Sequence, residues 1–128
     1  MARINISIFV ESRYQVNRKR LRKTVESTLD KQGASKPVDI SIAVVGDRKM
    51  RELSKKYKGE DKTRNVLSFS LSEGEATKLP TDVISLGDIV VSYPEIIREA
   101  SRDDMLVDEK MDELVLHGLS HLLGIHHE

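Results

Sequence analysis

The spacing of apolar residues changes along this chain between the two-residue period of β-strands and the 3.6-residue period of helices. The order of these segments restricts the fold more than any other feature. Apolar residues occupy every second position over residues 3–9 and 38–44, which is typical of half-buried strands. Residues 65–71 and 86–92 predict two more strands, and four other segments carry apolar residues at the spacing of amphipathic helices. The predicted order is β-α-β-α-β-β-α-α. We therefore expect an α+β fold in which a single domain, residues 1–128, packs an approximately four-stranded mixed sheet against helices that lie mostly on one side.

Capping residues predict where the helices begin and end. Asn17 is a suitable N-cap for the first helix, and Gly33 is a suitable stop. The last helix is predicted from about Leu106 to Leu123, with Gly124 as the left-handed residue that ends it. The polar residues 72–85, which include glycine and proline, predict a mobile loop between the last two strands.

Charge is unevenly distributed, although the 21 basic and 21 acidic residues give a formal net charge of zero. Residues 1–64 hold 17 basic and 8 acidic residues, a net +9, and residues 65–128 hold 4 and 13, a net −9. The hypothesis of a nucleic-acid partner is therefore kept, because the N-terminal half is strongly basic. The absence of cysteine excludes disulfides, thiolate zinc sites and a cysteine nucleophile, and it fits a reducing cytoplasm. No apolar run approaches the roughly 18 residues of a membrane span, so we expect a soluble, cytoplasmic protein without a membrane partner.

The four histidines all lie in the final 12 residues, in the segment HGLSHLLGIHHE. His117 and His121 are one helical turn apart, roughly 6 Å, so both imidazoles can meet one ion. Beyond the expected stop at Gly124, His127 can reach the same ion, and His126 is a possible alternative. Three imidazoles leave one tetrahedral position for water, which is typical of catalytic zinc. We therefore predict one Zn²⁺ per chain at this site.

Two simpler explanations compete with a metal site. Histidines on amphipathic helices are often only packed or solvated, and a histidine-rich C-terminus is sometimes a purification tag. The leucines that interrupt these histidines continue the helical core pattern, which argues against a tag. The pattern also differs from the zinc-peptidase motif H-E-x-x-H, because Gly118 stands where that motif has its glutamate base.

Three segments of the chain resemble one known family. HGLSHLLGIHH is similar to the H-G-x-x-H-L-x-G-x-D-H signature of the bacterial YbeY-type endoribonucleases, also called rRNA maturation factors. Upstream, YKGEDKTRNVLSFSL and LGDIVVS resemble that family's Y-R-G-K-D-K-P-T-N/D-V-L-S-F-P and L-G-D-I-x-I-S segments, in the same order. The resemblance implies a zinc-dependent, single-strand-specific endoribonuclease that acts in 16S rRNA 3′-end maturation and ribosome quality control. It places the metal ligands at His117, His121 and His127, and it implies single-stranded rRNA and the ribosome or its small subunit as partners.

The chain departs from the family pattern at four places. His126 replaces the usual aspartate before the last ligand, and Lys58 replaces the usual arginine, which removes a bidentate donor. Thr63 and Arg64 stand where Pro-Thr is common, which adds a cation. The chain ends at Glu128, whereas family members generally continue, so either this member is short or the sequence is incomplete.

A zinc-bound water would supply the nucleophile for phosphodiester hydrolysis, so no catalytic side chain is assigned beyond it. The remaining need is positive charge, and eight basic residues fall within 17 positions: Arg48, Lys49, Arg51, Lys55, Lys56, Lys58, Lys62 and Arg64. Lys58, Lys62 and Arg64 precede the NVLSF strand within the segment that resembles the family, and Asn65 begins that strand. We therefore predict substrate binding by Lys58, Lys62, Arg64 and Asn65.

Other polar residues have simpler explanations. A second basic run, residues 18–23, circles a helix and is better explained as a solvated face. Asn65 and Ser68 either contact substrate or complete the strand. Asp88 is expected to be structural.

Three functions are in competition. The favoured one is a zinc-dependent single-strand RNA endonuclease. A metallohydrolase of another class, such as a peptidase, needs a carboxylate near the metal from Glu73, Glu75 or Asp88. A non-catalytic ribosome-associated factor would instead saturate the metal with four ligands, including both His126 and His127.

Overall fold

The computed structural model describes residues 3–33, 36–70 and 83–126, the side chains of 125 and 126 excepted. Eight elements follow one another along this part of the chain: β1 (Ile4–Val10), α1 (Arg18–Lys31), β2 (Val38–Val45), α2 (Asp47–Lys58), β3 (Val66–Phe69), β4 (Ile84–Ser92), α3 (Tyr93–Arg102) and α4 (Val107–His126). The predicted order and the α+β class are confirmed.

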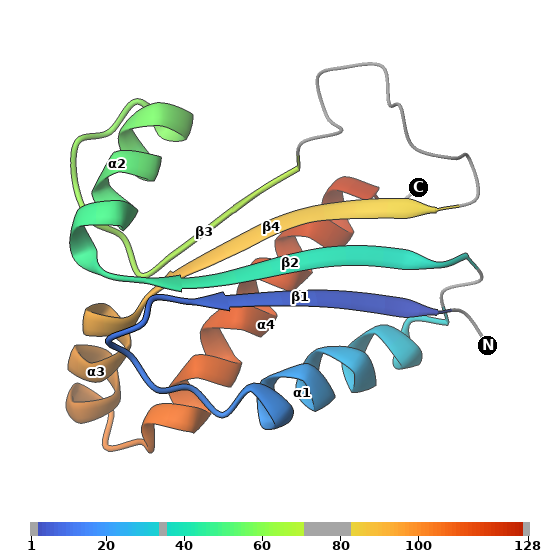
Figure 1. The fold of residues 1–128 in the computed structure, drawn as a ribbon, viewed down its shortest axis with the longest axis horizontal. Coiled ribbons are helices and arrows are strands. Elements are labelled where there is room, and N and C mark those ends of the chain that lie inside the picture. The colour runs from blue at the N-terminus through green and yellow to red at the C-terminus, as the bar shows by residue number, and fades with distance from the viewer. Residues whose placement is uncertain (1–2, 34–35, 71–82, 127–128) are drawn as a thin grey trace.

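The four strands form one mixed sheet in the order β1-β2-β4-β3. β1, β2 and β4 are parallel to one another, and β3 is antiparallel to β4 at the edge of the sheet (Figure 1). An extra residue in β4 makes a bulge, because Asp39 pairs with Ser85 and Ile40 with Gly87. Gly87 has φ +128°, and a Cβ there would lie 2.4 Å from the carbonyl oxygen of Phe69, so only glycine fits this bend.

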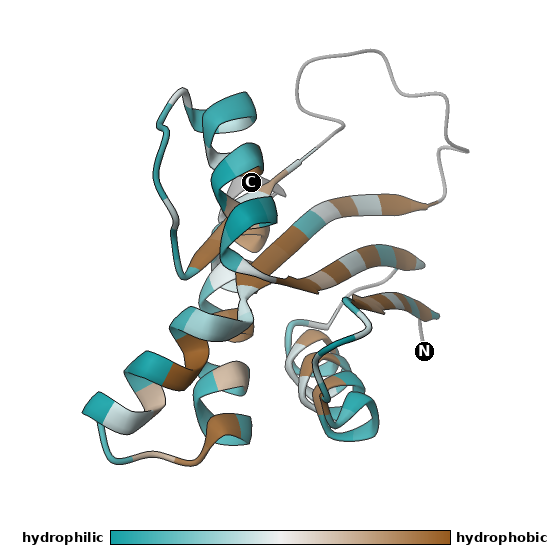
Figure 2. Cartoon of the chain, turned by 60° about the vertical axis from the view of Figure 1, so that its left-hand side comes forward, coloured by the Kyte–Doolittle hydropathy of each residue, from teal (hydrophilic) through white to brown (hydrophobic). Residues whose placement is uncertain are grey.

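The helices form two unequal layers on the sheet. α1 and α4 cover one face and α3 packs beside α4 at the end of the sheet, while α2 lies on the opposite face (Figure 1). The main core lies between the sheet and the α1–α4 layer, and it includes Ile42, Ile89, Val25 and Leu119. A smaller apolar cluster, Val45, Met50, Leu67 and Val90, holds α2 against the other face. In Figure 2 the strands are banded, since their apolar and polar residues alternate between the two faces.

Most predicted element ends agree with the structure. Asn17 caps α1, because its side chain accepts a hydrogen bond from the Arg20 amide at 3.0 Å. β4 begins at Ile84, two residues earlier than expected, and β3 ends at Phe69. Most of the predicted loop over 72–85 lies outside the described residues.

The predicted helix stop at Gly124 is wrong, because α4 continues to His126. A glycine ends a helix only when it adopts the left-handed conformation, and Gly124 keeps a helical backbone with open space where a Cβ would be. Leu122 and the half-buried Leu123 pack against the core and help to hold this last turn. Packing therefore outweighs the cost of about 1 kcal/mol for glycine inside a helix.

Candidate functional site

The two helical histidines lie on one side of α4, next to its buried stripe. Met111, Val115 and Leu119 are at most 4% exposed, as the helical pattern predicts. His117 and His121 are exposed and one turn apart on this helix. The helix therefore presents two imidazoles to the same surface, while the neighbouring apolar residues fix its orientation on the sheet.

Gly118 sets how closely this histidine pair approaches the sheet. A Cβ at Gly118 would lie 2.9 Å from Cγ2 of Ile89, which is closer than ordinary contact allows, and 3.4 Å from Cγ2 of Val66, at the limit of ordinary contact. The missing side chain thus brings α4 directly onto β3 and β4. The same contact explains why the zinc-peptidase glutamate is absent, since a side chain at this position would meet the core and not the surface.

A cleft of about 160 Å³ opens where α4 meets the edge strand β3. It is lined by Lys58, Arg64, Val66, Leu67, Ser68, His117, Gly118 and His121. The structure thus brings together two of the three predicted metal ligands, two of the four predicted substrate-binding residues, and Ser68.

An aromatic stack positions the Lys58 end of α2. The rings of Tyr57 and Phe69 are stacked, with centroids 4.3 Å apart and planes inclined by 13°. Such pairs contribute about 0.5–1.5 kcal/mol beyond the area that they bury. The stack joins the last turn of α2 to β3, so the next residue, Lys58, reaches the cleft.

A hydrogen-bond hub at Asp47 holds the segment that carries Arg64. The Asp47 carboxylate accepts hydrogen bonds from the hydroxyls of Thr63 at 3.1 Å and Ser92 at 2.9 Å, and it pairs with Arg98 at 3.2 Å. Desolvation on its own would raise the pKa of Asp47, but the hydrogen bonds from Ser92, Arg98 and Thr63 outweigh it and hold this pKa below its ordinary value. The start of α2, the end of β4 and α3 are therefore tied to the residue before Arg64.

Two of the predicted substrate-binding residues do not line the cleft. Lys62 is exposed and lies 3.9 Å from Glu60. The Asn65 amide donates to Glu99 of α3 at 3.0 Å, and its carbonyl oxygen accepts from the Val66 amide. These bonds give Asn65 a structural role at the start of β3. Substrate binding by Lys62 and Asn65 stays a prediction.

A peptidase would need a carboxylate near the two histidines, from Glu73, Glu75 or Asp88. Asp88 lies on the opposite face of the sheet, where it accepts a hydrogen bond from the Ser41 hydroxyl. Ile89, the next residue, is the one that meets Gly118 of α4, which fixes the two faces. Among the residues that the structure describes, no group of three histidine, aspartate or glutamate side chains could hold a metal. Glu73, Glu75 and His127 lie outside those residues, as does the side chain of His126.

The basic run at the start of α1 is distant from the cleft, because α1 packs at the β1 side of the sheet (Figure 1). Two of its members have structural partners: Arg20 pairs with Asp112 at 2.9 Å, and Arg22 donates to the Ile6 carbonyl at 2.7 Å. This arrangement agrees with the simpler explanation of the run. Separately, none of the helices in the described ranges is both long and apolar enough to cross a membrane.

The fold and the cleft together define a class: α+β proteins in which a helix with a His-x3-His pair packs beside the antiparallel edge strand of a mixed sheet. The chain belongs to the endoribonuclease YbeY family, whose model matches residues 7–128.

Relatives from three bacteria agree with this assignment. The endoribonuclease YbeY of Syntrophus aciditrophicus (strain SB) is 43% identical over 90 residues, which cover 70% of this chain and 55% of that protein. The Magnetococcus marinus protein of the same name is 33% identical over 97 residues, 72% of this chain and 66% of the relative. The Geobacter sulfurreducens protein is 33% identical over 118 residues, 92% of this chain and 77% of the relative. The chain therefore spans between about half and three quarters of these relatives.

A solved structure shares the fold. The solution structure of TM1509 from Thermotoga maritima superposes with a TM-score of 0.61 at 24% identity. The match covers 91% of this chain and 71% of that chain. The sheet and its covering helices are therefore a recurring architecture.

Proposed function

We propose that this chain is a zinc-dependent endoribonuclease that cuts single-stranded RNA in the cleft between α4 and β3. The observation that carries the proposal is the meeting of His117 and His121 with Lys58 and Arg64 in one cleft. Imidazoles suit a catalytic metal, and the two cations suit a phosphodiester. The chain's membership of the endoribonuclease YbeY family supports the same chemistry.

The donor set fits zinc as far as it is described. Two imidazoles one turn apart supply two nitrogen ligands. Because α4 does not end at Gly124, the resemblance of the segment HGLSHLLGIHH is what supports our proposal of His127 as the third ligand, with His126 as an alternative. The chemistry that a bound Zn²⁺ supplies is activation of a water molecule near neutral pH and stabilisation of charge on phosphoryl oxygens. Gly118 and the core residues beneath it fix the helix backbone from which the two imidazoles extend.

The cations and the size of the cleft select the substrate. Lys58 and Arg64 bind phosphate oxygens, and the Ser68 hydroxyl is placed to bond the backbone beside them. A cleft of about 160 Å³ is small, which suits a single strand that presents one phosphodiester better than a duplex. Because only 4% of the residues are aromatic, backbone contacts dominate and sequence selectivity is weak.

The cellular role follows from the resemblance of the three sequence segments. We propose that the RNA is the 3′ end of 16S rRNA, that the chain acts in its maturation and in ribosome quality control, and that it meets the ribosome or its small subunit in the cytoplasm. The peptidase alternative loses support, since Asp88 faces away from the histidines and Gly118 offers no base.

The test is cleavage of a labelled single-stranded RNA by the zinc-loaded chain. We expect cutting by the wild type and a loss on the order of a hundredfold or more in His117→Ala, because even outer-shell partners of metals cost about 10–100-fold. Ser120→Ala is the matched control, since Ser120 is exposed on the same helix but lines another pocket. An uncut RNA with the zinc-loaded wild type, or cutting by His117→Ala at the wild-type rate, would overturn the proposal.

A further inference from the structure

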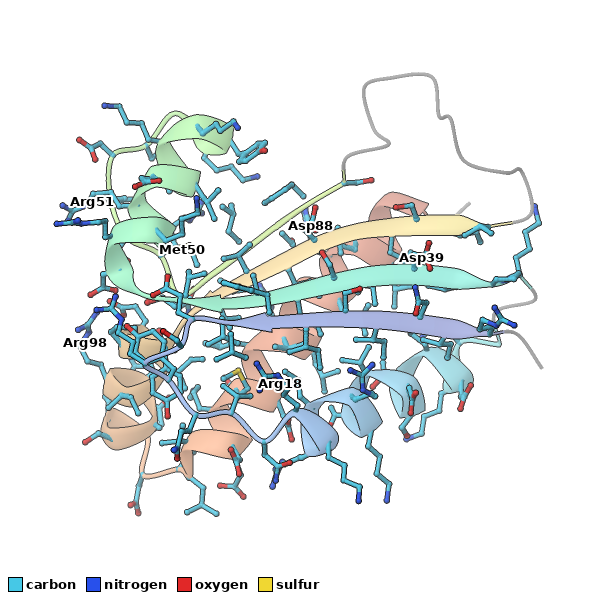
Figure 3. All side chains as sticks on the ribbon, in the orientation of Figure 1. Arg18, Asp39, Met50, Arg51, Asp88 and Arg98 are labelled. Atoms are coloured by element: carbon cyan, nitrogen blue, oxygen red, sulfur yellow. The ribbon has the colours of Figure 1, made fainter. Side chains whose placement is uncertain are left out.

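One side of α2 is a continuous row of cations that ends in the cleft. Arg48, Arg51, Lys55 and Lys58 recur at three- and four-residue spacing, and all four are exposed. At 100° per residue they fall within one quarter of the helix circumference. We call these four residues the α2 stripe. Figure 3 shows Met50 on the side of α2 toward the sheet and Arg51 on the outer side, and Figure 2 shows α2 as mostly hydrophilic.

The side chains of the α2 stripe lack ionic partners in the described part of the chain, as do Arg18, Lys19 and Lys23 of α1, but the stripe alone leads into the cleft. None of the four makes an ion pair or hydrogen bond with a residue in the described ranges. Some cations elsewhere are paired: Arg98 with Asp47, and the buried Lys110 with Asp103 at 2.8 Å. Even Lys49, on another side of α2, lies 3.7 Å from Glu52. The stripe is therefore free positive charge beside the candidate site.

Helix stability does not explain the stripe. Cations near the C-terminus of a helix are favourable, which accounts for Lys55 and Lys58. Arg48 lies in the first turn, where the helix dipole disfavours positive charge, and Arg51 lies too far from the C-terminus to gain from the dipole. The four cations also repel one another at i, i+3 and i+4 spacing. A polyanion that binds along the helix removes both penalties.

We propose that the α2 stripe binds the backbone of the single-stranded RNA on its way to the cleft. From Arg48 to Lys58 the helix rises about 15 Å, at about 1.5 Å per residue. That length corresponds to roughly three to five stacked nucleotides at about 3.4 Å each. This inference rests on the proposed function, and it adds a second contact region that lengthens the RNA footprint beyond the cleft.

The experiment compares two triple variants of the full chain. Arg48→Gln, Arg51→Gln and Lys55→Gln neutralise the outer part of the stripe and leave Lys58 in the cleft. Arg18→Gln, Lys19→Gln and Lys23→Gln remove the same charge from exposed positions of α1, on the other side of the sheet. Glutamine keeps helix propensity close to that of arginine and lysine, so circular dichroism should show both variants folded. Binding of a labelled oligouridine of about 16 nucleotides is measured by fluorescence anisotropy against salt, with a chelator present to prevent cutting.

We expect the α2 variant to bind at least about tenfold more weakly at low salt and to lose about two units of salt slope, at about 0.7 per lost phosphate contact. The α1 variant should bind as the wild type does. Equal weakening of both variants, or an α2 variant that binds like the wild type, would overturn the inference. A wild type that binds no RNA would overturn it as well.

The same variants separate this inference from the proposed function. If the zinc-loaded wild type cuts RNA and the α2 variant binds normally, the stripe fails and the nuclease stands. If the α2 variant alone binds weakly and the zinc-loaded wild type cuts nothing, the stripe stands and the nuclease fails.

Discussion

At Gly118 the backbone of α4 lies against the sheet more closely than a side chain would permit. The contacts that a Cβ would make, at 2.9 Å to Ile89 and 3.4 Å to Val66, are with buried or half-buried β-branched side chains that have little room to move. His117, beside this glycine, owes its place in the cleft to that approach. A single missing side chain therefore positions the histidine pair and leaves no glutamate base at the position that the H-E-x-x-H motif uses.

Substitution of the two α4 glycines gives opposite results in this account. Gly118→Ala should lower the free energy of unfolding by about 1–3 kcal/mol, the usual cost of overpacking a core. Gly124→Ala is the control, because open space surrounds its Cβ position and alanine favours a helix. It should raise the free energy of unfolding by up to about 1 kcal/mol.

Urea denaturation measures both effects. Loss of stability in Gly124→Ala would indicate a left-handed residue there, and would contradict the helical backbone of α4 to His126. Unchanged stability and RNA cleavage in Gly118→Ala would contradict the close approach.

At the scale of elements, the helix α2 is attached to the rest of the fold at both of its ends. Asp47 ties its first turn to Ser92 and Arg98, and Tyr57 stacks on Phe69 at its last turn. Met50 is fully buried between these two anchors. The helix backbone that carries the cations on the outer side of α2 is therefore fixed relative to β3 and the cleft.

Loss of the aromatic anchor should loosen the Lys58 end of this helix. Tyr57→Ala removes the stack on Phe69, and we expect the free energy of unfolding to fall by about 1–2 kcal/mol. The kcat/KM for single-stranded RNA should fall as well, because Lys58 is no longer held beside the histidines. Tyr57→Phe keeps the ring and should behave like the wild type in both assays. If Tyr57→Ala cleaves RNA with wild-type kcat/KM, the anchor has no part in positioning Lys58.

At the scale of the whole molecule, the Asp47 hub joins elements from both charge halves of the chain. Its pKa is held below the ordinary value, so the ionised form is favoured in the folded state. The stabilisation is fully present above the unfolded pKa, near 3.8, and is lost as the pH falls through the lower folded pKa.

Asp47→Asn tests this linkage. At pH 7 the variant should be less stable than the wild type by about 1 kcal/mol, a modest value because the carboxylate is partly exposed. The difference should shrink below about pH 4, where the Asp47 carboxylate begins to be protonated first in the unfolded chain and then, at lower pH, in the folded one. Unfolding curves at several pH values measure it, and a difference that stays constant down to pH 2 would contradict the hub.

Local pattern predicted the elements well, because each one repeats its signal over several residues. The alternation in β1 and β2 and the cap at Asn17 lie within short windows of sequence. Gly124 misled the helix prediction, since glycine is also tolerated inside a helix whose neighbours are packed. Tertiary contacts of the neighbouring leucines extend the helix past Gly124, and the local sequence pattern does not predict such contacts.

The sequence predicted the part of the site that depends on local spacing, and not the part that depends on tertiary contacts. His117 and His121 share one helix, so their proximity follows from spacing alone. The meeting of Lys58 and Arg64 with them depends on the position of β3 at the sheet edge, which periodicity does not specify. The Asn65 amide, a predicted substrate contact, is bonded to Glu99 on α3, 34 positions away in the sequence. The small residue between the two histidines was the signal available for the close helix approach.

The most direct test of the central claim is a high-resolution structure of the zinc-loaded chain, with the protein ligands counted. We predict one zinc ion bound by His117, His121 and His127, with the remaining position open toward Lys58 and the cleft. A zinc ion held by four protein ligands, with His126 and His127 both bound, would contradict a catalytic site and favour a non-catalytic factor. A zinc ion bound away from His117 and His121 would contradict the account altogether.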